Sequence, residues 1–153
     1  MDGLYYLDPR AIAIATPEDK PAVLREVARL FASAYDLDGD AVLSALLERE
    51  EIGSTGFGRA VALPHARIPT ISRPVAAVLR LARPVDFSAA DDKDVVLAFG
   101  LLSPAQAGAT HLHALASISR LLRDERMYAA LCEATEADAI YALLTNVADR
   151  DAA

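Results

Sequence analysis

The chain has 153 residues, of which 54% are hydrophobic and 24% are charged. This length favours a single domain over residues 1–153 with a sizeable core, and the composition excludes an intrinsically disordered chain. The formal net charge of -7 argues against a nucleic-acid-binding protein, because such a protein presents a basic surface to its ligand.

The sequence also bears on the compartment. A single cysteine excludes an internal disulfide and is typical of a reducing compartment. The first ten residues lack the basic and apolar segments of a signal peptide. The strongest apolar run, residues 95–102, is far shorter than the roughly 20 residues that a membrane-spanning helix needs. We therefore expect a cytoplasmic protein without membrane insertion.

The N-terminal part of the chain predicts a short extended segment and then a helix. Residues 11–15 are apolar and more typical of a loop or an edge strand than of a helix. Asp19 and Pro21 open an amphipathic helix, since proline is tolerated in a first turn. The residues expected on its buried face recur at helical spacing: Val23, Val27, Leu30, Phe31 and Ala34.

A second helix is predicted after a turn at residues 36–39. Asp40 is a good N-cap because its side chain can accept hydrogen bonds from the first turn. Gly53 is expected to end the helix in the manner of a C-terminal cap glycine. The residues expected to face inward are Val42, Leu43, Leu46 and Leu47.

The pattern changes over residues 59–103. The short apolar runs at 60–63, 75–81 and 95–102 are bounded by Pro, Gly, Asp or Ser, as strands buried on both faces are. Helices return after residue 109: one over 110–122, one from near Asp124, and one after Thr135, which forms a weak capping-box pattern with Asp138. Helices before and after a group of strands predict an α/β domain in which helices cover a sheet.

Residues 49–67 read R-E-E-I-G-S-T-G-F-G-R-A-V-A-L-P-H-A-R and combine a glycine turn, a short apolar run and a histidine after a proline. The glycine spacing fits neither a dinucleotide-binding motif nor a P-loop, so we expect no nucleotide cofactor. The turn still lets backbone N–H groups approach an anion, and Ser54 and Thr55 add hydroxyl donors. A tight turn that only joins a helix to a strand is the alternative.

His65 is the candidate nucleophile. A neutral imidazole nitrogen is competent near pH 7, because the ordinary histidine pKa lies near 6.5. Pro64 narrows the directions in which the ring can point. Taken alone, a histidine in a loop after a strand is more often structural.

His111 and His113 form an H-x-H pair that, with His65, raises the alternative of a zinc site. The surrounding leucines and isoleucine recur at helical spacing, however, and residues two apart on a helix do not face each other. At most one of the two histidines therefore shares a site with His65, and we expect no metal. Near a helix N-terminus the dipole disfavours imidazolium, so His111 is expected to be neutral and to donate one N–H.

Two arginines are candidates for binding phosphate. Arg49 stands among glutamates, as in a solvated charged run, but it also falls in the last helical turn before the glycine turn. From there its guanidinium can clamp phosphate oxygens in a bidentate manner. Arg67, two residues after His65, is a second candidate, and for it too the alternative is an ordinary solvated surface charge.

Together, R-E-x-x-G-S-T-G-x-G…A-x-P-H and the later T-H-L-H-x-L resemble the enzyme IIA proteins of the bacterial phosphoenolpyruvate-dependent phosphotransferase system, in the fructose–mannitol class and nearest its nitrogen-regulatory branch. The resemblance covers residues 7–145. It implies that His65 is phosphorylated by an HPr-like phosphocarrier protein, that His111 is the second active-site histidine, and that Arg49 helps to hold the phosphoryl group. It also implies the mannitol-type fold, a mixed β-sheet with helices on both faces. Ala60 and Ala66 occupy positions where the family often has glycine.

The combined hypothesis is a regulatory phosphohistidine carrier without metal or cofactor. His65 attacks, while Arg49, the His111 N–H and the turn around Ser54 and Thr55 hold the phosphoryl oxygens, with Arg67 as a further phosphate-binding residue. One alternative is a sugar-specific enzyme IIA that passes phosphate to a IIB domain, although no IIB or membrane segment follows in this chain. The other is an interaction module that controls a transporter or sensor kinase independently of phosphate.

Overall fold

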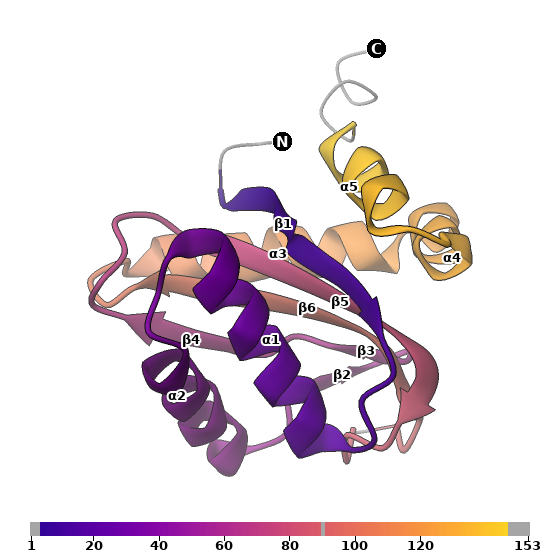
Figure 1. The fold of residues 1–153 in the computed structure, drawn as a ribbon, viewed down its shortest axis with the longest axis horizontal. Coiled ribbons are helices and arrows are strands. Elements are labelled where there is room, and N and C mark those ends of the chain that lie inside the picture. Colours follow the sequence, from indigo (N-terminus) through magenta and orange to yellow (C-terminus); the bar gives the residue numbers. More distant parts are fainter. Residues whose placement is uncertain (1–3, 90, 147–153) are drawn as a thin grey trace.

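The computed structural model describes residues 4–89 and 91–146, which form a sheet packed between helices (Figure 1). The elements in chain order are β1 Tyr6–Ala15, α1 Lys20–Tyr35, α2 Gly39–Ile52, β2 Gly56–Gly58, β3 Val61–Ala62, β4 His65–Ile68, β5 Val75–Val85, β6 Val95–Pro104, α3 Ala109–Arg123, α4 Glu125–Glu133 and α5 Ala137–Thr145.

The sheet has mixed topology. Its order is β1-β5-β6-β3-β2, with β4 also paired to β6. β1 is parallel to β5, β5 is antiparallel to β6, β3 and β4 are parallel to β6, and β2 is antiparallel to β3. The apolar segment at residues 11–15 thus belongs to an edge strand, as its composition indicates.

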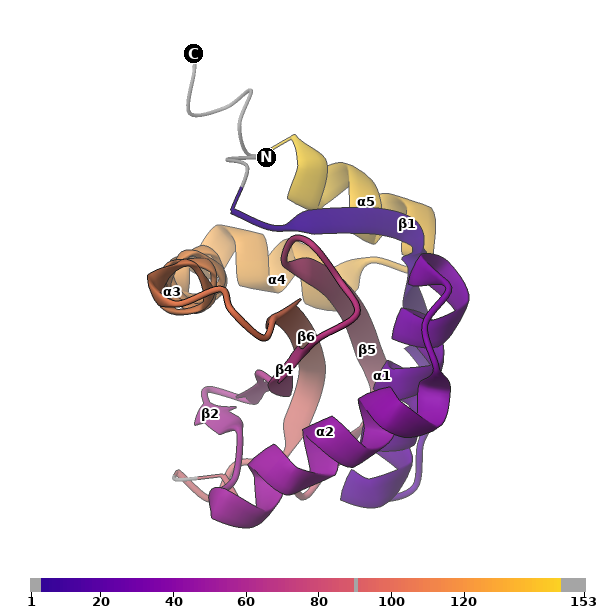
Figure 2. The same ribbon diagram turned by 90° about the vertical axis from the view of Figure 1, so that its left-hand side faces the viewer.

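Helices cover both faces of the sheet, and each face has its own apolar core. Because side chains alternate along a strand, Ala77 and Leu79 of β5 pack with α1 and α2, whereas Ala76 and Val78 pack with α3, α4 and α5. Figure 2 shows the sheet edge-on between these two layers. The predicted fold class, a mixed β-sheet with helices on both faces, is confirmed.

The first helix follows its prediction. Asp19 caps α1 by accepting a hydrogen bond from the N–H of Ala22, and Pro21 lies in the first turn. The five apolar residues expected to face inward are all buried.

The second helix differs from its prediction at both ends. Its N-cap is Asp38, which accepts hydrogen bonds from the N–H groups of Asp40 and Ala41, so Asp40 lies inside the first turn. Gly53 follows the helix with extended backbone (φ 169°) rather than in the left-handed region. Val42 and Leu46 are buried, Leu43 is half-buried, and Leu47 is 39% exposed. The inward placement of Leu47 is therefore wrong.

The second half of the glycine turn forms a hairpin of β2 and β3. The residues that connect the two strands have backbone conformations in the left-handed region, with positive φ. Gly58, Arg59 and Ala60 have φ values of 98°, 58° and 67°. A residue other than glycine in this region costs about 1–2 kcal/mol, which gives a physical reason why related proteins often have glycine at the position of Ala60. Ala66 instead lies buried inside β4 with no positive φ, so its backbone makes no such demand.

Two local predictions from the sequence need correction. The run at 60–63 is strand only over Val61–Ala62. β4 was not predicted, because its four residues mix His, Ala, Arg and Ile and show no strand pattern of their own. The cap of α5 is Glu136 rather than Thr135, and no side chain caps that helix. The backbone carbonyl of Glu136 binds the first turn instead.

Candidate active site

β4 places His65 at an edge of the sheet, between α2 and α3 (Figure 2). β3 and β4 run along the same edge of β6, and only Leu63 and Pro64 separate them. Pro64 has no N–H to give the ladder, but its carbonyl accepts a hydrogen bond of 2.9 Å from Leu101 N. Strand pairing therefore resumes at once, and His65 begins a regular strand rather than lying in a loop.

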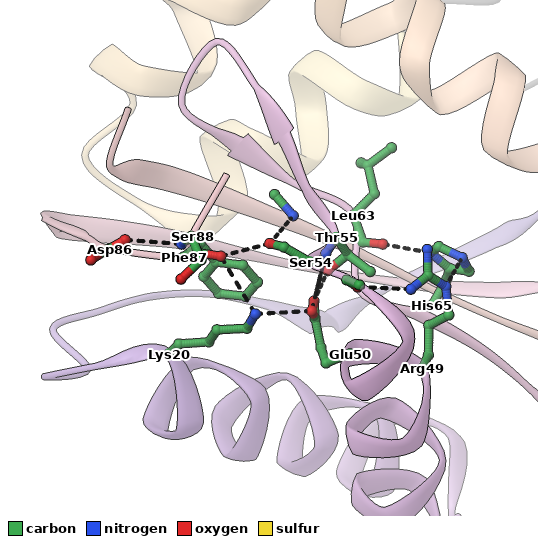
Figure 3. Close-up of polar contacts among 12 residues, drawn as sticks. Lys20, Arg49, Glu50, Ser54, Thr55, Leu63, His65, Asp86, Phe87 and Ser88 are labelled. Atoms are coloured by element: carbon green, nitrogen blue, oxygen red, sulfur yellow. Dashed lines mark hydrogen bonds and ion pairs between the residues drawn. The ribbon is translucent and has the colours of Figure 1, made fainter. Parts of the chain in front are cut away.

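The two ring nitrogens of His65 have different partners (Figure 3). Nδ1 lies 2.7 Å from the carbonyl oxygen of Leu63, and because a carbonyl only accepts, Nδ1 carries the hydrogen and donates it. Arg49 donates its Nε–H to Nε2 over 3.2 Å, so Nε2 holds the lone pair. These contacts define a neutral imidazole in a single tautomer.

The electrostatic surroundings of His65 also favour the neutral ring. Burial has the largest effect and lowers the pKa of His65 below its ordinary value. The Leu63 carbonyl raises this pKa, the charge of Arg49 lowers it, and the charge of Glu50 raises it. Since the net shift is downward, the lone pair on Nε2 stays available at physiological pH.

Arg49 projects from the last turn of α2 toward His65. Besides its contact with Nε2, its Nη1 donates to the carbonyl oxygen of Gly53 over 2.8 Å. The guanidinium is thus fixed at two points, and Arg49 is not simply part of a solvated charged run.

His111 lies in the first turn of α3 and is 5% exposed. Its ring centroid is 5.5 Å from that of His65, and its Nδ1 is 2.6 Å from Oγ of the buried Ser103 in β6. The pKa of His111 is lowered to about 4, first by burial, then by the charge of Arg67, and last by the positive charge that His65 carries when it is protonated. The direction agrees with the expected neutral state, but burial is the main cause.

His113 is exposed on α3, away from this cluster. The structure therefore brings one histidine of the H-x-H pair to His65 and not the other, as helical spacing indicates. In the part of the chain that the structure describes, no group of three His, Cys, Asp or Glu side chains is placed to hold a metal ion.

Arg67 lies on the same face of β4 as His65, because side chains two apart on a strand share a face. Its side chain is exposed, and Nη2 donates to the carbonyl oxygen of Gly108 over 3.3 Å, just before α3. Arg67 therefore lies at the rim of the site.

Ser54 and Thr55, just before β2, form hydrogen bonds to other groups of the protein (Figure 3). The Ser54 hydroxyl donates to the carbonyl oxygen of Phe87 over 2.6 Å. The backbone N–H of Thr55 donates to the Glu50 carboxylate at 2.9 and 3.0 Å, and its hydroxyl donates to the same carboxylate. The contact of these two residues with phosphate stays a prediction, since neither is among the described residues that line the pocket.

His65 is one of the residues that line an open pocket. The residues that line it come from α2, β4 and α3: Ala45, Glu48, Arg49, Ile52, His65, Ala66, Arg67 and His111. It offers one nitrogen nucleophile beside two guanidinium groups and a second, neutral histidine. Such a set can accept an electrophile bearing negatively charged oxygens and stabilise those oxygens.

Ser103, which contacts His111, was not among the residues predicted for the site. The strand register could have placed Ser103 near the site. Ser103 pairs with Arg67 of β4, two residues along from the pair of Leu101 with His65. That register depends on β4, which the sequence pattern did not show.

The comparison with known families agrees with this geometry. Residues 6–147 match the family model described as the phosphoenolpyruvate-dependent sugar phosphotransferase system, EIIA 2. The chain belongs to this family, so the resemblance drawn from residues 49–65 and 110–115 is confirmed.

Two curated relatives differ in their names. A nitrogen regulatory protein of Bradyrhizobium diazoefficiens is 41% identical over 137 residues, which are 89% of this chain and 90% of that protein. A fructose-specific EIIA component of Haloferax volcanii is 40% identical over 112 residues, which are 73% of each protein.

Solved structures share the architecture. The nitrogen regulatory protein IIA-Ntr from Neisseria meningitidis has a TM-score of 0.83 and 30% identity, covering 90% of this chain and 95% of that one. The mannitol IIA of Escherichia coli has a TM-score of 0.76 at 20% identity, covering 92% and 99%, and shows the fold alone. Over the described residues, no helix combines the length and apolar character that spanning a bilayer requires.

Proposed function

We propose that this protein is a regulatory phosphohistidine carrier of the nitrogen-related phosphotransferase system, and that Nε2 of His65 receives the phosphoryl group. One observation carries the proposal: the Leu63 carbonyl holds the hydrogen on Nδ1, which leaves the lone pair on Nε2 beside Arg49. The donor would be an HPr-like carrier with its own phosphohistidine.

The transfer is an in-line displacement. The Nε2 lone pair forms the new N–P bond while the N–P bond of the donor histidine breaks, and that electron pair returns to the donor nitrogen. Phosphoryl transfer needs mainly positioning and charge stabilisation. The ring of His65 keeps its Nδ1–H and gains positive charge, which the Leu63 carbonyl stabilises. No metal, cofactor or general base enters this step.

Arg49 and His111 hold the transferred group in this proposal. As Nε2 becomes bonded to phosphorus, the Nε–H of Arg49 moves from nitrogen to a phosphoryl oxygen, where a charge-assisted hydrogen bond is stronger. If the Ser103 hydroxyl donates to Nδ1 of His111, that ring carries its hydrogen on Nε2 and presents it to a second oxygen. Arg67 adds positive charge from the rim.

Ser54 and Thr55 have a less direct part in the proposal. Their hydroxyls fix the turn that precedes β2, and only backbone N–H groups of the turn remain as candidates for contact with the phosphoryl group. Thr55→Val removes the hydroxyl and keeps the backbone N–H groups. Slower transfer together with a disturbed His65 ring would support the indirect part, whereas slower transfer with an undisturbed ring would show that the hydroxyl contacts the phosphoryl group directly.

The surroundings of the pocket fit a protein partner. Among the described residues, the large hydrophobic side chains that are exposed are Leu47, Ile52 and Leu112, at 39%, 83% and 62%. Ile52 lines the pocket, and Leu112 follows His111 on α3. Exposed apolar side chains beside a reactive group mark an interaction site, and we assign the HPr-like donor to it.

Labelling tests the proposed function. Incubation with the upstream phosphotransfer proteins and labelled phosphoenolpyruvate is expected to label the wild type through an acid-labile, base-stable bond. His65→Ala is expected to remain unlabelled, and His113→Gln to be labelled normally. Normal labelling of His65→Ala would contradict the mechanism.

The 40% identity to a fructose-specific component favours a second candidate, a sugar-specific enzyme IIA. In that case the phosphorylated protein passes its group to a purified IIB domain. We expect no such transfer. We expect phosphorylation instead to change binding to a transporter or sensor kinase, because it adds a charge of about -1.5 to -2 beside the exposed apolar side chains of Ile52 and Leu112. A pull-down comparing both forms tests this, and a partner indifferent to His65→Asp would indicate a phosphate-independent module.

A further inference from the structure

Two neighbouring residues of α2 form hydrogen bonds in different directions, one to the His65 ring and one to the turn before β2. Arg49 contacts Nε2 of His65, whereas the next residue, Glu50, reaches the glycine turn (Figure 3). The Glu50 side chain is only 6% exposed and is not among the described residues that line the pocket. Its carboxylate is therefore not placed to touch a phosphoryl group or to remove a proton there.

The contacts of the Glu50 carboxylate fix the turn before β2. It accepts hydrogen bonds from the backbone N–H and the hydroxyl of Thr55, and it forms an ion pair of 3.1 Å with Lys20 of α1. Lys20 in turn lies 4.8 Å from the centre of the Phe87 ring and donates to the Phe87 carbonyl oxygen over 3.4 Å. The same carbonyl accepts the hydroxyl of Ser54.

The turn then leads to the nucleophile through two backbone groups. The carbonyl oxygen of Thr55 accepts a hydrogen bond of 2.9 Å from the N–H of Leu63. The carbonyl oxygen of Leu63 accepts the Nδ1–H of His65 over 2.7 Å. Thr55 and Leu63 are both buried, so water does not readily replace either contact.

From this chain of contacts we propose that Glu50, clamped by Lys20, is a positioning residue that fixes the tautomer and orientation of the His65 ring through Thr55 and Leu63. Arg49 then holds one ring nitrogen while Glu50, indirectly, holds the other. Two adjacent residues of the R-E pair thereby orient the ring from both sides. The effect on transfer rests on the proposed function, whereas the effect on the ring does not.

A substitution that keeps the shape of Glu50 tests this role. Glu50→Gln replaces one accepting oxygen by an amide donor, which faces the N–H and hydroxyl of Thr55 and the ammonium of Lys20. Glu51→Gln is the matched control, since it makes the same change one residue along at an exposed position. ¹⁵N-resolved NMR of the imidazole rings in the unphosphorylated protein reports which nitrogen of His65 carries the hydrogen. Stopped-flow transfer from the phosphorylated carrier reports the rate.

In the wild type and in Glu51→Gln, we expect one protonated Nδ1 and one unprotonated Nε2 in His65. In Glu50→Gln, both ring signals should shift toward a mixture of tautomers, and the transfer rate constant should fall about tenfold or more, because a displaced nucleophile loses its alignment. A carboxylate at the right distance matters, so Glu50→Asp should not restore the wild-type ring. Wild-type ring signals and rate in a folded Glu50→Gln would overturn the proposal.

Lys20→Met covers the case in which Glu50→Gln does not fold. It keeps an unbranched side chain against Phe87 but removes the cation that clamps the carboxylate. Ring signals and a rate unchanged in Lys20→Met would then reject the proposal, and a smaller shift in the same direction would support it. If wild-type protein takes no phosphoryl group at all, the proposed function fails, while the ring signals still decide the positioning role.

Discussion

His65 is held in one protonation state because each ring nitrogen faces a partner with a fixed hydrogen-bonding sense. The Leu63 carbonyl only accepts and the Nε–H of Arg49 only donates, so the ring has no freedom to exchange tautomers without breaking a contact. Burial keeps the ring neutral as well. At the scale of the residue, the neutral tautomer that the proposed transfer to Nε2 requires is therefore already present in the unphosphorylated protein.

Ser103 gives a first prediction. Removing its hydroxyl in Ser103→Ala leaves Nδ1 of the buried His111 without its partner. We expect transfer to His65 to slow about five- to tenfold, since a hydrogen bond of this kind is worth about 1 kcal/mol. Affinity for the carrier should not change. Rapid-mix transfer assays check this against Ser72→Ala, an exposed serine, and equal rates in both variants would refute the role of Ser103.

His111 gives a prediction for stability against pH. Its pKa is about 4 in the folded protein and about 6.5 when unfolded, so between these values the unfolded chain binds more protons. Folding stability therefore falls as pH drops from about 6.5 to about 4, by at most about 3.4 kcal/mol from this group, since one pKa unit corresponds to about 1.4 kcal/mol. The free energy of unfolding, measured with urea at several pH values across this window, should depend less steeply on pH in His111→Gln than in the wild type. His113→Gln, at an exposed position, should keep the wild-type slope; if both variants behave alike, His111 is not responsible.

At the scale of the element, the β2–β3 hairpin carries backbone strain at Ala60, with φ at 67°. Ala60→Gly relieves the steric cost but makes the unfolded chain more flexible, so we expect a net gain of about 0.5–1 kcal/mol in the free energy of unfolding. The control is Ala66→Gly, buried in β4, which should lose stability. Thermal unfolding of both variants measures the difference, and a less stable Ala60→Gly would show that the strain estimate is wrong.

The same elements show how far the sequence leads. The spacing of apolar residues predicted α1 and the helices after β6, because burial of the apolar face supplies most of the stability of an amphipathic helix. It did not predict β4, whose four residues depend on pairing with β6 rather than on a pattern of their own. Asp38 and Asp40 are equally good caps by residue type, so the sequence did not determine which of them begins α2, and in the structure the cap is Asp38.

The site was predictable for a different reason. His65, Arg49 and His111 belong to motifs that identify the family, and the structure gathers all three around one pocket. The contacts of Glu50 and Ser103 were not predictable, because each depends on how two elements pack in space: α1 against α2 for Glu50, and α3 against β6 for Ser103. A hydroxyl in a sequence reveals its donor capacity but not its partner, which is why Ser54 and Thr55 gave a different expectation from the contacts observed.

At the scale of the whole molecule, a stable sheet with two apolar cores presents its reactive edge between α2 and α3. We expect Ile52→Asp to weaken binding of the HPr-like carrier at least tenfold, because Ile52 is 83% exposed beside the pocket and a carboxylate there opposes apolar contact. Ala129→Asp adds the same charge at an exposed position on α4. Calorimetric titration with the carrier compares them, and equal affinities would place the docking surface elsewhere.

The most direct test of the account is the site of phosphorylation itself. Protein with ¹⁵N-labelled histidine, phosphorylated by its upstream carrier, is examined by NMR for coupling between ¹⁵N and ³¹P. We predict one phosphoryl group, bonded to Nε2 of His65, with Nδ1 of the same ring still protonated. A phosphoryl group on Nδ1 of His65, or on His111 or His113, would contradict the account.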